Sequence, residues 1–214
     1  MGVAERRERV REEVRRKILD AARELFATEG YEKVTMRGIA QAIEYSPTAL
    51  YHHFEDKSAL VNALCEEDFS HLLGLLMRQA PPPDPVEQIR QMGGAYARFG
   101  VENPNHYRFM FMTPLDFKAG HEHELSTSGQ RAFGLLHQAV EEAIARGRFR
   151  HGDSMTMAQV LWSSLHGVVA LLITYDPGQF PCAPAAPDLV EQVIEHGIRG
   201  FLAPSQNTKG PRGV

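Results

Sequence analysis

Residues 35–57, which read TMRGIAQAIEYSPTALYHHFEDK, constrain the fold more than any other stretch of the chain. Two short helices are expected here with almost nothing between them. The hydroxyl of Thr35 can cap the first helix, residues 36–43, and Ser46 followed by Pro47 is a strong start signal for the second. The stretch therefore predicts a tight helix pair.

The second helix of this pair has two chemically different faces. Leu50 and Phe54 lie four residues apart and are expected to face inward. Helices of about two turns bury too little surface by themselves, so a third helix must lie beneath them. A pair whose second helix points small, polar and aromatic groups outward is typical of a helix-turn-helix, in which that helix enters the major groove of DNA. The outward set is Thr48, Ala49, Tyr51, His52 and His53.

The string SPTALYHHFEDK at residues 46–57 resembles the recognition helix and the following helix start of the TetR family of bacterial repressors. The similarity runs from about residue 14 to residue 60 and includes residues 18–22, 25–26 and 30–31. The chain departs from the family at Glu44 and Thr48, where glycine is usual or frequent. A non-glycine residue with positive φ at position 44 would cost of order 1 kcal/mol.

A helix-turn-helix of this kind implies a set of DNA contacts. Thr48 and His52 are the candidates for base edges, since a threonine methyl can touch a thymine methyl. Tyr51 and Lys57 are candidates for phosphate contacts, with Lys57 at the positive end of the next helix. Thr35 and Arg37 are expected to contact phosphate from the preceding helix.

Elsewhere apolar residues recur at helical spacing, and the sequence has no period-two strand pattern and no repeat. An all-α chain of about nine helices is predicted, with an N-terminal three-helix DNA-binding domain and a C-terminal helical domain for ligand binding and dimerisation. The expected domains are residues 1–57 and 58–204, followed by a disordered tail, 205–214. The remaining helices are expected over residues 10–29, 57–79, 84–102, 106–111, 128–146, 155–175 and 188–202, with residues 1–9 frayed.

Charge is unevenly distributed along the chain. The net charge is −4, but residues 1–60, here called the head, hold 11 basic and 11 acidic residues. The head is therefore neutral and can contact phosphate locally. Two interpretations of the arginine run near the start remain open. It is either a solvated helix face paired with interleaved glutamates, or an arm that reaches DNA phosphate or a minor groove. The run is Arg6, Arg7, Arg9, Arg11, Arg15 and Arg16.

The motif Trp162-x-x-x-His166-Gly167, together with NPNHYRFMF at residues 103–111, resembles a TetR ligand-binding subtype named after its Trp-His-Gly signature. Trp162 and His166 face one way on a helix, and the aromatic residues upstream could converge on them around an apolar cavity. The alternative for each of these residues is plain core filling. The expected lining residues are Tyr96, Phe99, Tyr107, Met110, Phe133, His137, Trp162 and His166.

The family resemblance also implies a homodimer, in which the last two long helices pack against their twin as a four-helix bundle. The expected apolar patch is Ser164, Val168, Leu172, Ile194, Ile198 and Phe201, with Gly197 and Gly200 permitting close approach. A two-fold dimer fits a palindromic operator, because its recognition helices would meet half-sites roughly 34–36 Å apart.

The predicted function is a ligand-responsive regulator of transcription, most simply a repressor released from double-stranded DNA by a small apolar or aromatic inducer; activation remains open. Neither catalytic residues, nor a cofactor, nor a metal site is predicted. The alternatives are an interaction module with a solid core and a metal-dependent enzyme built on His121, Glu122, His123 and Glu124. The sequence has no signal peptide pattern and no uninterrupted apolar run of about 18 residues, so a cytoplasmic protein with reduced Cys65 and Cys182 is expected.

Overall fold

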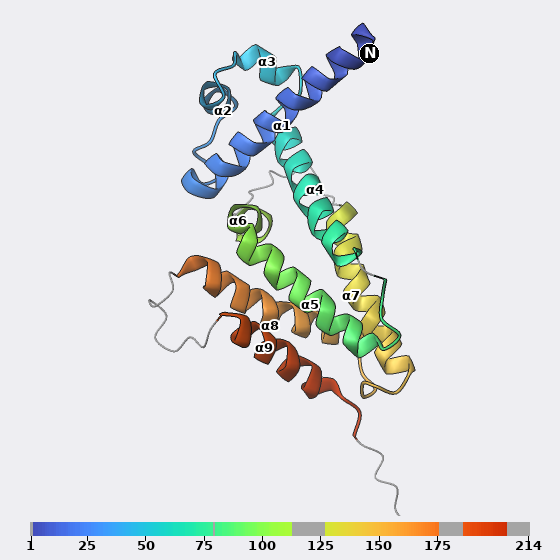
Figure 1. The fold of residues 1–214 in the computed structure, drawn as a ribbon. Helices are drawn as coiled ribbons and strands as arrows, with labels where there is room; N and C mark the ends of the chain where they lie inside the picture. The colour runs from blue at the N-terminus through green and yellow to red at the C-terminus, as the bar shows by residue number, and fades with distance from the viewer. Residues whose placement is uncertain (1, 79, 113–126, 176–185, 205–214) are drawn as a thin grey trace, which may run out of the picture. The chain divides into compact units, whose positions relative to one another are not determined.

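The computed structural model describes residues 2–78, 80–112, 127–175 and 186–204, and within them it shows nine helices and no strand (Figure 1). The all-α prediction is confirmed. The helices are α1 (Val3–Glu29), α2 (Met36–Ala42), α3 (Pro47–Tyr51), α4 (Lys57–Leu76), α5 (Pro85–Glu102), α6 (Pro104–Met112), α7 (Thr127–Ala145), α8 (Ser154–Thr174) and α9 (Ala186–Phe201).

The chain forms two compact units, and three helices contribute to both. Unit 1 comprises residues 1–75 and 99–132, and unit 2 comprises residues 76–98 and 133–214. The division passes through α4, α5 and α7. These units do not follow a single cut in the sequence, and the expected boundary between residues 57 and 58 stays a prediction.

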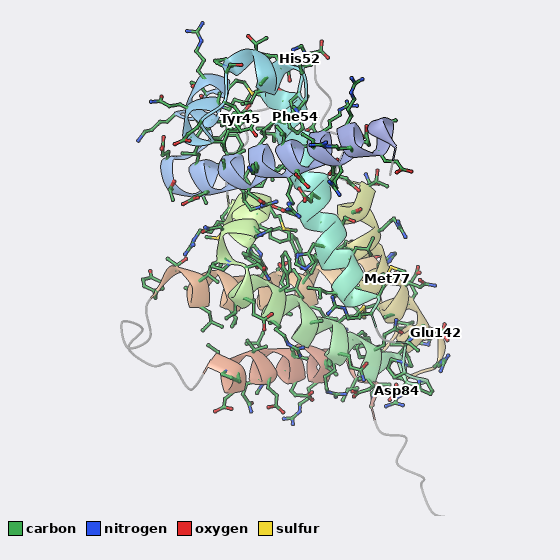
Figure 2. The ribbon with its side chains drawn as sticks, turned by 45° about the horizontal axis from the view of Figure 1, so that its top comes forward. Tyr45, His52, Phe54, Met77, Asp84 and Glu142 are labelled. Atoms are coloured by element: carbon green, nitrogen blue, oxygen red, sulfur yellow. The ribbon has the colours of Figure 1, made fainter. Side chains whose placement is uncertain are left out.

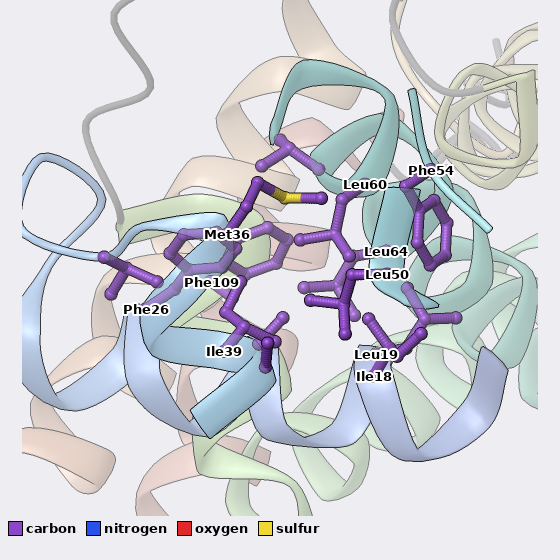
Figure 3. Packing of buried hydrophobic residues seen from close by; sticks show 14 of the residues in the cluster. Ile18, Leu19, Phe26, Met36, Ile39, Leu50, Phe54, Leu60, Leu64 and Phe109 are labelled. Atoms are coloured by element: carbon purple, nitrogen blue, oxygen red, sulfur yellow. The ribbon is translucent and has the colours of Figure 1, made fainter. Parts of the chain in front are cut away.

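The core of unit 1 gathers the inner faces of α1 to α4 around one residue of α6, Phe109 (Figure 3). Phe109 is completely buried and stacks on Phe26 of α1 with ring centres 5.4 Å apart. Each fully buried side chain of this size contributes roughly 1.5–3 kcal/mol relative to an exposed one. The core therefore anchors the short helices, which could not form alone. Other members with no exposed surface are Ile18, Leu19, Ile39, Leu50, Leu60 and Leu64.

Helix α1 begins seven residues earlier than the apolar pattern predicts, so the expectation that residues 1–9 fray was wrong for residues 3–9. Charged side chains account for the extension. The Gly2 amide donates to the Glu5 carboxylate over 2.9 Å, and Arg9 lies 3.8 Å from Glu13 one turn further along. Such pairs stabilise a helix that buries little surface there.

The core of unit 2 lies among α5, α7, α8 and α9. Two glycines allow the helices to approach closely. A Cβ on Gly93 would meet Ile194 at 3.1 Å, and a Cβ on Gly197 would meet Leu161 at 2.9 Å. Gly197 therefore serves the contact of α9 with α8 inside one protomer, and the guanidinium of Arg90 on α5 holds the Glu195 carboxylate of α9.

The turn between α2 and α3 is a Schellman motif with Glu44 in the position that glycine usually occupies. The Tyr45 amide donates to the Ala40 carbonyl over 2.9 Å, and the Glu44 amide donates to Gln41 over 3.1 Å. Glu44 has φ 59°, the one positive value at a non-glycine position among the described residues. The expected positive φ at this turn is thus confirmed.

The same motif ends α7, where the chain does use glycine. The Arg148 amide donates to the Ala143 carbonyl over 2.8 Å, and the Gly147 amide donates to Ile144 over 2.9 Å, with Gly147 at φ 66°. Among the described residues the same motif is thus seen with Gly147, which has no Cβ, and with Glu44, whose Cβ makes the left-handed conformation costly.

Replacing Glu44 with glycine should stabilise the protein. Because the left-handed backbone conformation costs a residue with a Cβ, Glu44→Gly is expected to raise the free energy of unfolding by about 1 kcal/mol. Urea denaturation followed by circular dichroism measures this change. Glu44→Gln is the control, since it removes the charge but keeps the Cβ. An equal gain in both variants would show that charge, rather than the backbone, sets the cost.

Candidate nucleic-acid interface and ligand site

Helix α3 is held by its inner residues and presents its outer ones. Leu50 has no exposed surface, whereas Thr48 and His52 are exposed and Tyr51 retains 52% of its accessible surface. Figure 2 shows His52 on the outer side of the head, while Phe54 lies between α3 and α1. This arrangement leaves the predicted base-reading side chains open to a partner.

Side-chain caps set the starts of α2 and α3, as the sequence predicts. The Thr35 hydroxyl accepts a hydrogen bond from the Gly38 amide over 3.0 Å, and the Ser46 hydroxyl accepts one from the Ala49 amide over 3.2 Å. Thr35 and Arg37 are both exposed at the start of α2. They are accessible, although the Thr35 hydroxyl already has a structural task.

Lys57 is occupied within the head. Its ammonium group donates to the Tyr31 carbonyl and lies 3.8 Å from the centre of the Tyr31 ring. Burial lowers the pKa of this ammonium, and the charge of Glu32 opposes that change. A phosphate contact by Lys57 would require this internal contact to break, so that role stays a prediction.

A buried ionic cluster joins three helices of unit 1. Asp68 of α4 is 1% exposed. The guanidinium of Arg23 on α1 donates to its carboxylate over 2.8 Å and 3.0 Å, and the His106 Nδ1 of α6 lies 2.9 Å from the same oxygen. Removing one partner of such a pair leaves a buried charge uncompensated, which destabilises the fold. The cluster therefore ties α1, which carries the helix-turn-helix, to both α4 and α6.

Sequence reasoning missed this cluster, although α4 carries a signal for it. Its buried residues Leu60, Leu64 and Leu72 recur at multiples of four, and Asp68 occupies the remaining position of that stripe. A carboxylate in an apolar stripe requires a partner. The identity of the partner could not be predicted, because Arg23 lies 45 residues away on another helix and no local pattern connects the two.

In unit 2 the structure brings together four of the eight predicted ligand-site residues. The Trp162 indole N–H donates to the Tyr96 hydroxyl over 3.2 Å, and the same hydroxyl lies 3.2 Å from the His166 Nδ1. Phe133 packs edge-on against Trp162 with ring centres 6.1 Å apart. Burial lowers the pKa of His166, which favours the neutral form of its imidazole.

The other four predicted residues have different surroundings. His137 is in unit 2, where its Nε2 lies 2.9 Å from the Ser154 hydroxyl at the start of α8. Phe99 and Tyr107 belong to unit 1 and have no exposed surface, as core residues do; Met110, also in unit 1, is half-buried. A single cavity lined by all eight stays a prediction.

The residues predicted for the dimer contact divide between core and surface. Of the residues expected on α9, Ile198 is buried in the core of unit 2, whereas Ile194 and Phe201 pack against that core and stay partly exposed. The close approach at Gly197 is to Leu161 of α8. The apolar face of α9 thus contacts α8 of its own protomer, and a dimer contact through these residues stays a prediction. On α8, Val168 is buried and Ser164 is exposed.

Helix α8 nevertheless keeps an open apolar stripe. Val160 and Leu171 are 44% and 40% exposed, and Ser164 and Gly167 lie between them on the same face. By length and composition alone α8 could cross a membrane, which the sequence reading did not anticipate. A core helix of a soluble protein passes the same test, so this is weak evidence for a span.

Residues 121–124, the candidate zinc ligands, lie outside the described residues, as does Cys182. Cys65 is a buried free thiol, and burial raises its pKa to about 12. Within the described ranges no group of three or more His, Cys, Asp or Glu side chains has a metal-binding arrangement.

Comparison with known proteins decides the family. Residues 18–64 match the model of the bacterial regulatory proteins of the tetR family, and residues 89–200 match the tetracyclin repressor-like C-terminal domain. The chain belongs to the tetR family. The first match contains the whole of α2 and α3, and the second spans more than half of the chain.

Individual relatives agree with this assignment. The chain is 43% identical over 145 residues to the HTH-type transcriptional repressor AcnR of Corynebacterium efficiens, covering 67% of this chain and 68% of that protein. It is 48% identical over 65 residues to the HTH-type transcriptional repressor Rv1474c of Mycobacterium tuberculosis, covering 30% of this chain but only 35% of that repressor. The tetR-family regulator PfmR of Thermus thermophilus shares the fold, with a TM-score of 0.68 at 23% identity over 85% of this chain and 97% of PfmR.

Family membership makes this tetR-family protein a regulator and not an enzyme, which rules against the metal-dependent alternative. The C-terminal match is to a tetracyclin repressor-like domain, and it does not name the Trp-His-Gly subtype. That finer assignment stays a prediction.

The buried cluster should contribute strongly to stability. Asp68→Asn removes the only buried carboxylate that Arg23 contacts among the described residues, leaving the exposed carboxylates of Asp20 and Glu67, and is expected to lower the free energy of unfolding by about 3 kcal/mol. Glu67→Gln is the matched control, because Glu67 is a second, exposed partner of Arg23 at 3.6 Å and should cost about 1 kcal/mol or less. Urea denaturation of both variants measures the difference. Equal losses would contradict a special role for the buried pair.

Proposed function

We propose that this tetR-family protein is a ligand-responsive repressor that binds a palindromic operator as a homodimer. The observation that carries the proposal is α3, a five-residue helix anchored by the buried Leu50 and presenting Thr48, Tyr51 and His52 to solvent. The relatives AcnR and Rv1474c, which are named repressors, support repression over activation.

In the proposed complex α3 lies in the major groove. Thr48 and His52 contact base edges there, and Tyr51 reaches phosphate. Arg37 and Thr35, both exposed at the start of α2, contact phosphate from the neighbouring helix. Lys57 is proposed to reach phosphate by giving up its contact with the Tyr31 carbonyl.

The inducer is proposed to be a small apolar or aromatic molecule that binds beside Trp162 and His166. A neutral imidazole and an indole already hydrogen-bonded to Tyr96 offer aromatic surface rather than charge. Trp162 is the only tryptophan in the chain, so its fluorescence reports on this site directly. Release from DNA requires a coupling of only about 1–3 kcal/mol, and α4, which belongs to both units, is the element proposed to transmit it.

The homodimer is proposed to form through the open stripe of α8, from Val160 through Ser164 and Gly167 to Leu171. Only 28% of the most apolar part of α8 is buried within one protomer. Apolar surface of that extent on a soluble protein favours a partner, and the small residues at the centre of the stripe permit another helix to approach. Because the matched family is one of bacterial regulatory proteins and AcnR is a transcriptional repressor, we also propose that the protein is cytoplasmic.

Sequence reading by α3 is tested with duplexes that the wild-type protein selects from a random pool. Thr48→Ala and His52→Ala are each expected to cost roughly 1–3 kcal/mol on a selected duplex and much less on a scrambled one. Arg37→Gln should weaken binding to both duplexes alike. Fluorescence anisotropy gives the dissociation constants. Failure of the wild-type protein to enrich any duplex, or equal losses on both duplexes for Thr48→Ala and His52→Ala, would refute the proposal.

The dimer contact is tested by placing a charge in the α8 stripe. Gly167→Glu introduces a carboxylate where a Cβ meets no atom within 4 Å in the protomer, so the variant should fold yet become monomeric. Gly74→Glu makes the same change at an exposed position on α4 and should remain dimeric. Sedimentation equilibrium distinguishes the two states. A dimeric Gly167→Glu variant would place the contact elsewhere.

A further inference from the structure

The first turns of α1 extend beyond the part of the helix that the head core requires. Core contacts on α1 begin at Val14 and Ile18, but the helix starts at Val3. In Figures 1 and 2 alike, this N-terminal part runs on past α3 and the start of α4, all within unit 1. More than two turns of helix therefore stand beside the recognition helix without packing on the core.

These turns carry a line of arginines on one face. Arg7, Arg11 and Arg15 follow one another at intervals of four, and the same line continues into the buried positions Ile18 and Ala22. The line therefore lies on the side of α1 that faces the rest of the head. From Arg7 to Arg15 it extends ~12 Å along the helix axis, enough to reach more than one phosphate.

The glutamates of this segment occupy other positions and are in part already engaged. Glu13 pairs with Arg9 at 3.8 Å, and Glu5 accepts the Gly2 amide. Within the described residues Arg7 and Arg11 have no ion pair, and both are exposed. Residues 1–16 hold six arginines against four glutamates, a local positive excess in a chain whose net charge is −4.

The arginine line reaches the segment that follows α3. The Arg15 guanidinium carbon lies 5.4 Å from the centre of the Phe54 ring. Burial lowers the pKa of His53, and the positive charges of Arg11 and Arg15 lower it further. The buried Nδ1 of His53 has no hydrogen-bond partner among the described residues. The arginine line thus reaches the residues that directly follow α3.

We propose that Arg7 and Arg11 form a second DNA contact, which binds the phosphate backbone beside the groove entered by α3. Arg15, which packs on Phe54, anchors the line of arginines. This inference rests on the proposed DNA-binding function and extends it. Guanidinium groups pair with phosphate oxygens in bidentate geometry, which suits them to such a contact. The contact adds affinity and salt dependence and leaves base selection to Thr48 and His52.

The test compares two double variants of the full chain. Arg7→Gln/Arg11→Gln removes the proposed contacts, whereas Arg6→Gln/Arg9→Gln removes the same charge from the other side of α1. Arg15 is left in place because it packs on Phe54. Glutamine is a good helix former, and circular dichroism and the melting temperature verify that both variants keep α1 folded.

Dissociation constants are measured against salt concentration on a duplex selected by the wild-type protein and on its scrambled version. Arg7→Gln/Arg11→Gln is expected to reduce the slope of log affinity against log salt by about two, with the ratio between the two duplexes unchanged. Arg6→Gln/Arg9→Gln should change the slope by less than half of that amount.

Two results would overturn the inference while leaving the proposed function intact: a wild-type slope in Arg7→Gln/Arg11→Gln, or equal reductions in both double variants, which would indicate a general effect of net charge. If the wild-type protein binds no duplex, the proposed function and this inference fail together.

Discussion

The carboxylate of Asp68 is the constraint on which the rest of unit 1 depends. A charge with 1% exposure cannot remain in a protein core unless its partners are held in place, and here they come from α1 and α6. The Arg23 guanidinium must present its edge to the Asp68 carboxylate, and this requirement fixes the rotation of α1 about its own axis relative to α4. Since α1 also forms the floor beneath α2 and α3, the orientation of the recognition helix follows from an ion pair buried beneath it.

The same cluster gives unit 1 a way of responding to changes in α6. Phe109 of α6 stacks on Phe26 of α1, and His106, three residues earlier, shares the Asp68 oxygen with Arg23. A shift of α6 must therefore disturb two contacts: the stacking of Phe109 on Phe26 of α1, and the hydrogen bond of His106 to Asp68, the carboxylate that binds Arg23 of α1. Packed contacts of this kind have discrete arrangements and do not deform continuously, which suits them to a two-state regulator.

The sequence predicted most of the fold, because the decisive signals are local. Capping by Thr35 and Ser46, Pro47 at a helix start and apolar residues at helical spacing each act within one turn, and every predicted helix is present. Long-range pairings could not be read in the same way. Nothing local connects Arg23 with Asp68, or directs the Lys57 ammonium to the Tyr31 carbonyl. For α9, periodicity identified the apolar face correctly but did not indicate whether a twin or the protomer's own α8 covers it.

Glu44 illustrates how a functional surface and a stability optimum can diverge. The Schellman turn at the end of α7 uses Gly147, so the chain's other turn of this geometry shows the less costly solution. At the α2–α3 turn a glutamate occupies the strained position next to the surface that is proposed to meet DNA. On the proposed DNA-binding function, a carboxylate beside α3 repels any phosphate that comes close to it, which is the opposite of the attraction proposed for Arg7 and Arg11 on α1.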